Sequence, residues 1–330
     1  MQLATDRPEP TTHRKAMIVK GSALEHTGRV SIEPIPDFDL DRTIFKTLEG
    51  APQRFVMASR VGKEVSFDRV VTEDMSAAYA KQLAETPLPE VSPALLQFLV
   101  EECDFDVEHA DGSFLDHLYF CFEYTARHYP QHSPIVALLH SILGTGTNTF
   151  AMEASKIDAL RTHLTDFEWT HIEAFPSVLR LLYDHGLREE LNANMHRIDR
   201  LASISCHRVI DNAPITLTAE DFWIQMNYQL IHFIDFLPVA NWAVHQNETS
   251  FIVFRAVYDL MSRAQKIEAE VGYRPATGNR TLVREKTLGV LGWLVTKMPV
   301  GLSERMAASS VRKFSERIGH NMSYQLTWRD

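Results

Sequence analysis

The stretch Glu108–Thr147, EHADGSFLDHLYFCFEYTARHYPQHSPIVALLHSILGTGT, contains two helical patterns that each carry a histidine. In the first, apolar residues recur at the spacing of one helical face, and His117 lies at the border of that stripe. The second begins with Ser133-Pro134, a pair typical of a helix start, and continues almost wholly apolar. His140 is therefore expected to be buried near the end of the second helix.

A buried neutral imidazole needs partners for its nitrogens, because an unsatisfied one costs roughly 1 to 3 kcal/mol. A metal ion is one such partner, and a hydrogen bond to a backbone carbonyl or to Tyr119 is the alternative. The short link between the two helices favours antiparallel packing, which would bring His117 and His140 together. The pair therefore indicates a metal site.

The composition is that of a soluble globular protein, with 330 residues, 45% hydrophobic residues and a formal net charge of −10. A nucleic-acid-binding domain usually carries a basic patch, so this acidic balance argues against nucleic acid as a partner. The three cysteines, Cys103, Cys121 and Cys206, form no CxxC pair. Their number and spacing suit a reducing compartment and argue against both a disulfide scaffold and a zinc ribbon.

Neither a targeting segment nor a membrane span is expected. The first twenty residues contain prolines and mixed charges in place of the apolar middle of a secretory signal. The longest apolar stretch, Leu288–Leu302, is interrupted by Lys297 and Pro299 and is too short to span a bilayer. We therefore expect a cytoplasmic protein with no membrane partner.

The chain divides into four segments, and the fold is expected to be mainly α. Residues 1–28 lack sustained periodicity and are expected to form a mobile tail. Residues 29–92 are mixed, and 93–245 form a helical core. Residues 246–330 form a C-terminal helical extension in which basic residues outnumber acidic ones at the end.

Two individual helices within this core follow from spacing alone. Apolar residues predict one helix over 113–128 and another over 189–204.

Asp235 is the third candidate site residue. Thr218 and Asp221 have the spacing of a capping box, which begins a helix that Pro238 ends. Asp235 falls in the last turn of this helix, where the partial negative charge of the helix end disfavours a carboxylate. Burial adds to the cost, so a cation or donors must compensate. A hydrogen bond to Trp242, a salt bridge to a distant arginine and a metal ion all remain open.

Three stretches together resemble the HD-domain superfamily, which is named for a histidine on one helix, a His-Asp pair ending the next, and a distant aspartate. The matching stretches are GSFLDHL, IVALLHS and LTAEDFWIQMNYQLIHFID, and the resemblance covers roughly residues 95–245. Within that superfamily, the chain is similar to an uncharacterised branch in which His-Ser-x-Tyr-Gly-Thr replaces His-Asp. The resemblance implies an HD-like helical bundle with His117, His140 and Asp235 as metal ligands.

The chain departs from the superfamily at Ser141, which stands where the bridging aspartate would be, and at Leu143, which replaces the tyrosine of the branch. A neutral hydroxyl cannot neutralise two divalent ions, so a mononuclear centre is expected. His109 would complete a set of three histidines and one aspartate by folding back from the helix start. Such a set suits Fe, Mn or Zn, and imidazole alone does not choose among them.

Glu168 and His171 have the ExxH spacing that places both on one helical face, which makes His171 a further candidate ligand. The resemblance implies a metal-dependent hydrolase acting on a small polar metabolite, with Glu168 or Asp116 as the base. An iron oxygenase on the same site is one alternative, and a non-catalytic binding or assembly protein is another. Homo-oligomer formation stays open.

Overall fold

The computed structural model describes residues 7, 9–24, 31–34, 63–66, 69–103, 113–144, 152–237, 246–274, 294 and 296–330. These residues are mainly helical with a small amount of sheet, which confirms the predicted fold class. Among them no helix combines the length and apolar character needed to cross a bilayer.

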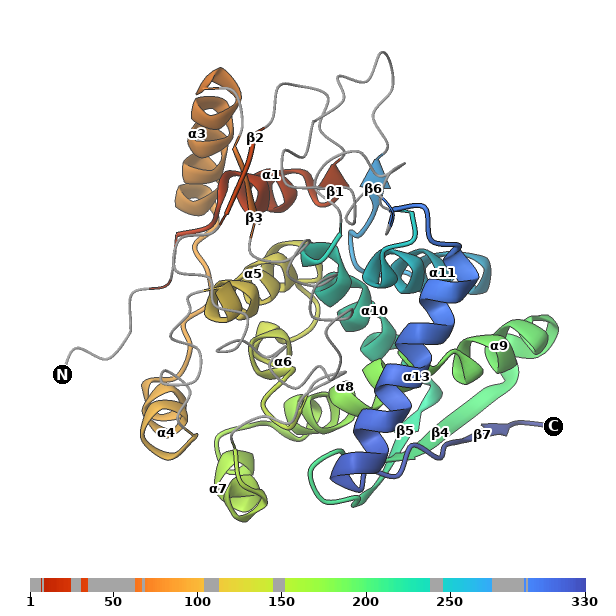
Figure 1. The fold of residues 1–330 in the computed structure, drawn as a ribbon. Helices are drawn as coiled ribbons and strands as arrows, with labels where there is room; N and C mark the ends of the chain where they lie inside the picture. The colour runs from red at the N-terminus through yellow and green to blue at the C-terminus, as the bar shows by residue number, and fades with distance from the viewer. Residues whose placement is uncertain are drawn as a thin grey trace.

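Helix α10 (Ala219–Asp235) lies at the centre of the helices (Figure 1). Its start follows the predicted capping pattern, because the side chain of Thr218 accepts a hydrogen bond from the backbone N–H of Asp221. All residues from Phe222 to Ile234 are buried, so the helix is enclosed on every side. Any polar side chain on such an enclosed helix faces the protein interior, so a site that uses these side chains must be a buried one.

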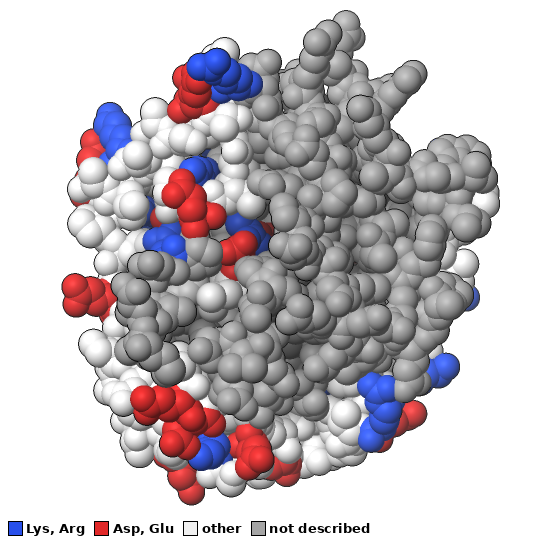
Figure 2. Space-filling view, turned by 60° about the vertical axis from the view of Figure 1, so that its left-hand side comes forward, with Lys and Arg blue, Asp and Glu red and all other residues white. Residues whose placement is uncertain are grey.

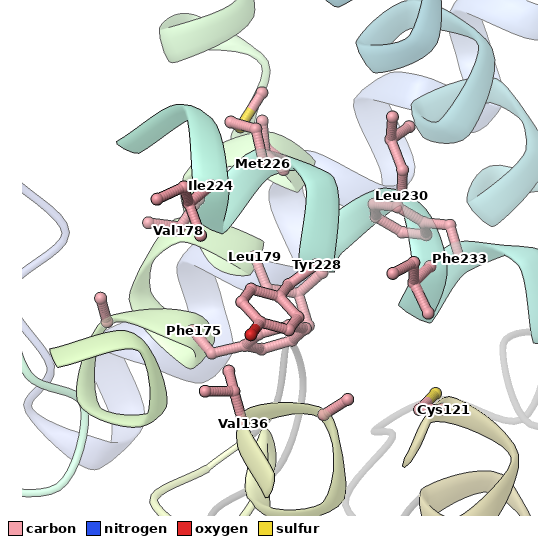
Figure 3. Close-up of a cluster of buried hydrophobic side chains, with 14 of the residues drawn as sticks. Cys121, Val136, Phe175, Val178, Leu179, Ile224, Met226, Tyr228, Leu230 and Phe233 are labelled. Carbon is pink, nitrogen blue, oxygen red and sulfur yellow. The ribbon is translucent and has the colours of Figure 1, made fainter. Parts of the chain in front are cut away.

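Helices α5 (Ser113–His128), α8 (Asp166–Asp184) and α11 (Thr249–Ala264) contact α10, and α6 (Pro134–Leu139) and α13 (Val300–Ile318) pack against these helices. Helices α5, α6 and α8 form one packed group, and α11 and α13 extend the bundle, with α13 against α8 and α11. Figure 3 shows the shared interior, where Val136, Phe175, Leu179 and Tyr228 from three helices point toward one another.

Helices α5 and α6 begin where the sequence predicts. The helix expected over 113–128 has those bounds, and Ser133 caps α6 by accepting from the N–H of Ile135, with Pro134 at the first turn. Helix α6 ends at His140, its C-cap residue. The predicted burial of this histidine is confirmed.

The helix predicted over 189–204 is wrong. The chain there forms α9 (Gly186–Ala193), a 3-10 turn η3 (Met195–Arg200) and then strand β4 (Leu201–His207). Strand β4 pairs antiparallel with β5 (Pro214–Thr218) on one side and β7 (Gln325–Trp328) on the other. The partner β7 lies more than a hundred residues away in the chain, so local spacing favoured a helix although tertiary pairing makes a strand. The C-terminal segment that was expected to be helical therefore also contributes strand β7, which pairs with β4.

The expected mobile tail is wrong for residues 12–24. Helix α1 (Thr12–Lys20) buries Met17 and Ile18 completely and packs against α3 (Arg69–Glu85) and α5. Gly21 ends the helix with a φ of 64°, a conformation that favours glycine. The parallel pair of β1 (Ala23–Leu24) and β6 (Tyr273–Arg274) follows directly. No apolar periodicity is visible in this stretch because α1 is short and buries charged as well as apolar residues.

Five further elements complete the description. Strands β2 (Ser31–Pro34) and β3 (Lys63–Ser66) pair antiparallel within the segment expected to be mixed. Helix α4 (Pro93–Cys103) precedes α5, and the 3-10 turn η2 (Ala154–Lys156) leads into α7 (Ile157–Arg161).

Candidate metal centre

His117, from the first turns of α5, is the centre of the candidate site. Its ring is 3% exposed and makes a polar contact through each nitrogen. Nδ1 is 2.8 Å from Oδ2 of Asp235 at the end of α10, and Nε2 is 3.3 Å from Nε2 of His140. The structure therefore brings together the three side chains that the sequence places on three separate helices.

His140 is held by the end of its own helix. Its Nδ1 is 2.7 Å from the carbonyl oxygen of Ala137. A carbonyl can only accept, so Nδ1 carries the proton and Nε2 carries a lone pair. Burial lowers the pKa of His140 to about 3, and the neighbouring His117 acts in the same direction. The ring is therefore neutral at physiological pH, with its lone pair directed at His117.

Asp235 fixes His117 in the matching tautomer. Burial alone would raise the pKa of Asp235, but the charge of Arg14 and the hydrogen bond from His117 outweigh it and hold that pKa well below its usual range. An ionised carboxylate only accepts, so Nδ1 of His117 donates to it and the neutral tautomer has its lone pair on Nε2. With both rings in these neutral tautomers, two nitrogen lone pairs would face each other across 3.3 Å. Such an arrangement is repulsive unless a proton or a metal ion lies between them.

The separation of the two nitrogens fits a tetrahedral metal ion. Two imidazoles bound about 2.0–2.1 Å from such an ion have their nitrogens roughly 3.3–3.4 Å apart. The observed Nε2–Nε2 distance of 3.3 Å falls in this range. Two imidazoles alone leave the coordination of such an ion incomplete, so the site needs a third donor.

Cys121, one helical turn after His117 on α5, could supply a third donor. Its Sγ is 3.9 Å from Nε2 of His117, against roughly 3.5–3.6 Å for sulfur and nitrogen on one tetrahedral zinc ion. One donor atom from each of His117, Cys121 and His140 lies within 4.8 Å of the other two. Burial raises the pKa of the Cys121 thiol well above its ordinary value, and Asp235 adds to this. A coordinated metal would reverse that preference, because metal binding deprotonates a thiol.

A third imidazole, His232, also borders the site. Its ring lies edge-on to His117 and His140, with centroids 5.1 and 4.8 Å away, and it also contacts Phe175 and Phe236. Burial, followed by the two neighbouring histidines, lowers its pKa well below the ordinary value. Within the described residues, its buried Nδ1 has no hydrogen-bond partner. A buried polar atom of this kind normally has a hydrogen-bond partner.

Asp235 has a different position from the one expected. The sequence suggested a direct metal ligand, but its carboxylate bonds the nitrogen of His117 that faces away from His140. Arg14 of α1 holds the same carboxylate through two hydrogen bonds, Nε to Oδ1 at 2.9 Å and Nη2 to Oδ2 at 2.8 Å. The donor group of three residues does not include Asp235, which orients His117 instead.

The other predicted site residues that the structure describes are not part of the donor group. His109 is outside the described residues. Asp116 is half-buried, and its Oδ2 is 3.5 Å from Nη1 of Arg14. Glu168 accepts from the backbone and hydroxyl of Thr165 and from the hydroxyl of Ser133, so it works as the reciprocal partner in the capping box of α8.

His171 is a structural histidine in this arrangement. It is fully buried, its Nδ1 is 3.1 Å from Oε1 of Gln225, and its Nε2 is 3.8 Å from Asp221. Among the described contacts, none joins it to His117 or His140. Glu168 therefore contributes to the cap of α8 and His171 to its interior packing, and neither is among the donor atoms near His117 and His140.

Sequence reasoning missed three residues of the site. Cys121 follows His117 at the i, i+4 spacing that places two ligands on one helical face, and His232 precedes Asp235 by three residues on α10. Both spacings were visible. Arg14 is 221 residues from Asp235, and no local pattern connects them.

Comparison with known proteins finds no matching family model, no matching curated protein and no matching solved structure. The site is therefore interpreted from its own geometry.

We predict that replacing Cys121 with serine lowers the affinity for zinc by more than about 100-fold, because loss of a ligand should exceed the cost of losing its orienting neighbours. The affinity for manganese should change much less, since manganese prefers oxygen donors. Competition with a chromophoric chelator measures both affinities. Cys206→Ser, which changes another buried thiol on β4, is the matched control. Equal zinc affinities in the two variants would remove Cys121 from the site.

We also predict a pH effect at His171. Burial lowers its pKa to about 4, against about 6.5 in an unfolded chain, so between these values the unfolded state binds the additional proton. The unfolding free energy therefore does not depend on this group above about pH 6.5. As the pH falls from there toward about 4, the unfolding free energy decreases by up to roughly 1.4 kcal/mol per pH unit.

Urea unfolding at several pH values tests this assignment. His171→Gln should flatten the fall in unfolding free energy over that window, whereas His196→Gln, at an exposed position, should leave it unchanged. An unchanged slope in His171→Gln would show that the buried imidazole does not titrate as described.

Proposed function

We propose that this protein is a mononuclear metalloenzyme that hydrolyses a small polar metabolite. The observation that carries the proposal is the opposition of the Nε2 atoms of His117 and His140 at 3.3 Å, with both Nδ1 atoms committed to acceptors. A cation between the rings resolves this opposition, and the spacing matches a tetrahedral ion.

The donor set favours zinc among the three metals considered. Two imidazoles suit Zn, Fe and Mn alike, but a cysteine sulfur is a soft ligand that manganese binds poorly. His117, Cys121 and His140 would hold the ion, and Asp235 would orient His117. Three protein ligands with a fourth position left for substrate or water is the usual pattern of catalytic zinc, whereas structural zinc has four protein ligands.

Hydrolysis is favoured over oxygenation by the third ligand. Non-haem iron oxygenases typically use two histidines and one carboxylate, and here the third donor is a thiol while the carboxylate of Asp235 is bonded by Arg14 and His117. When bound, the ion would lower the pKa of a water molecule and polarise the bond to be cleaved.

Asp116 is the better candidate for the base of the two predicted carboxylates. It neighbours His117 in the chain and lies beside Arg14 at the edge of the site, with its side chain one quarter exposed. Glu168 is engaged in the cap of α8. A residue that accepts three hydrogen bonds at a helix start is poorly placed to take a proton from a substrate.

The surroundings favour a small substrate with an anionic group. His117 and His140 are each 3% exposed, so the site is enclosed by protein and can admit only a small molecule. A divalent ion with one thiolate and neutral imidazoles retains one positive charge, since Arg14 and Asp235 cancel each other. An anionic group at the fourth position would neutralise that buried charge.

The described part of the face in Figure 2 shows no continuous basic area. Figure 2 shows basic side chains singly or beside acidic ones on the described part of that face, with acidic side chains gathered along its lower edge. An electrostatic footprint for phosphate chains would need a continuous basic area.

We predict that the chain, purified without a histidine tag or chelator, contains about one equivalent of metal, chiefly zinc. His117→Gln and His140→Gln should retain less than about a tenth of an equivalent, because each loses a ligand. His171→Gln, a buried histidine outside the site, should retain the full amount. Elemental analysis measures the content, and added zinc should raise the melting temperature of the metal-free wild type and of metal-free His171→Gln, but not of His117→Gln or His140→Gln.

A metal-free wild type that zinc, manganese and iron all fail to stabilise would contradict the proposal. The two imidazoles would then share a proton, and the chain would be a non-catalytic binding or assembly protein.

The reaction class has its own test. We predict that the zinc-loaded wild type releases product from a panel of phosphate esters, amides and related small anions without consuming oxygen, and that His140→Gln does not. Colorimetric phosphate and amine assays and an oxygen electrode provide the measurements. Oxygen uptake by the iron-loaded protein, with no hydrolysis by the zinc form, would favour the oxygenase instead.

A further inference from the structure

Arg14 reaches the candidate centre from the opposite end of the chain. Its guanidinium forms a two-pronged contact with Asp235, Nε to Oδ1 at 2.9 Å and Nη2 to Oδ2 at 2.8 Å. The same Oδ2 accepts from Nδ1 of His117 at 2.8 Å. A continuous chain of hydrogen bonds thus runs from α1 through the end of α10 to the imidazole on α5.

Anchoring of α1 does not require this contact. Met17 and Ile18 are fully buried, and the carbonyl of Ile18 is 2.6 Å from Nε2 of His128. A buried ion pair is weak evidence for stability, because well-packed apolar residues of similar volume often stabilise a protein as much. The Arg14–Asp235 pair therefore calls for a role other than holding α1 in place.

The geometry of the contact suggests that role. A guanidinium is planar and rigid, and its two N–H groups hold both carboxylate oxygens in one plane. The carboxylate cannot then rotate, and Oδ2 stays directed at Nδ1 of His117. Asp235 also sits at the last residue of α10, where the partial negative charge of the helix end disfavours a carboxylate, and the charge of Arg14 compensates for this.

We infer that Arg14 is a positioning residue of the metal centre, which fixes the carboxylate of Asp235 and through it the ring and tautomer of His117. Helix α1 thereby completes a site whose donors all come from α5 and α6. The inference rests on the proposed metal site for its effect on affinity. The effect on the ring of His117 does not depend on a metal.

The test compares Arg14→Ala and Arg14→Lys with the wild type. Loss of an orienting neighbour typically costs 10–100-fold in metal affinity, so Arg14→Ala should bind zinc about 10–100-fold more weakly. Arg14→Lys should recover only part of this, because lysine supplies a point charge without the planar fork. Millimolar guanidinium chloride should restore the affinity of Arg14→Ala by occupying the vacated position, and should not alter the wild type.

Arg188→Ala is the matched control. Arg188 is also a buried arginine, but it bonds the carbonyl of Leu182 and the carboxylate of Glu304, away from the centre. Its replacement should affect unfolding without guanidinium-dependent recovery of zinc affinity. If Arg14→Ala binds zinc as the wild type does, or if guanidinium restores nothing, the positioning role is overturned.

Nitrogen NMR of histidine-labelled, metal-free protein gives a second readout. The wild type should show His117 protonated at Nδ1, Arg14→Ala should lose this single pattern, and guanidinium should restore it. His117→Gln assigns the resonance. A wild type that binds no zinc would refute the metal site, and the NMR comparison would then decide the role of Arg14 alone. An unchanged His117 pattern in Arg14→Ala would overturn the inference.

Discussion

The opposition of two imidazole nitrogens is the constraint on which the centre depends. His140 has its Nδ1 committed to the carbonyl of Ala137, and His117 has its Nδ1 committed to Asp235. Both commitments come from helix ends, since α6 ends at His140 and α10 ends at Asp235. Helix ends are where backbone carbonyls and charges are free to act on side chains. The packing of α5, α6 and α10 thus sets the protonation pattern as well as the positions.

The surrounding core explains how so many polar groups can be buried together. Aromatic rings of Phe175 and Phe236 contact the imidazoles, and α10 is enclosed along its length. In such an environment each polar atom must find a partner. Arg14 and Asp235 cancel each other's charge, and burial keeps His140 and His232 neutral by lowering the pKa of each. The orphaned nitrogen of His232 is the exception among the described residues of the centre.

The parts of the fold that were predictable from sequence are those with strong local patterns. Helix α5 has a continuous apolar stripe, and α6 and α10 have capping residues at the predicted places, so their starts were correct. The encounter of His117, His140 and Asp235 followed from order and spacing along these helices. The direct bond from Asp235 to a metal did not follow, because spacing does not show which imidazole nitrogen a carboxylate faces.

Features that depend on distant pairing were not predictable in this way. The residues around strand β4 have the apolar spacing of a helix, but β4 forms a strand because it pairs with β5 and with β7 near the end of the chain. Helix α1 precedes the core by many residues and carries few apolar positions, yet Arg14 meets Asp235 221 residues later. Cys121 and His232 were within reach of a spacing argument, since each is one helical turn from a residue already identified.

The long separation between Arg14 and Asp235 bears on how the protein matures. Domains generally fold as units while the ribosome is still adding residues. A nascent chain that has exposed only α5 and α6 presents two imidazoles and a thiol, but lacks the carboxylate that sets the ring of His117. In the proposed site, tight capture of an ion would therefore wait until α10 has left the ribosome and Arg14 of α1 has reached Asp235.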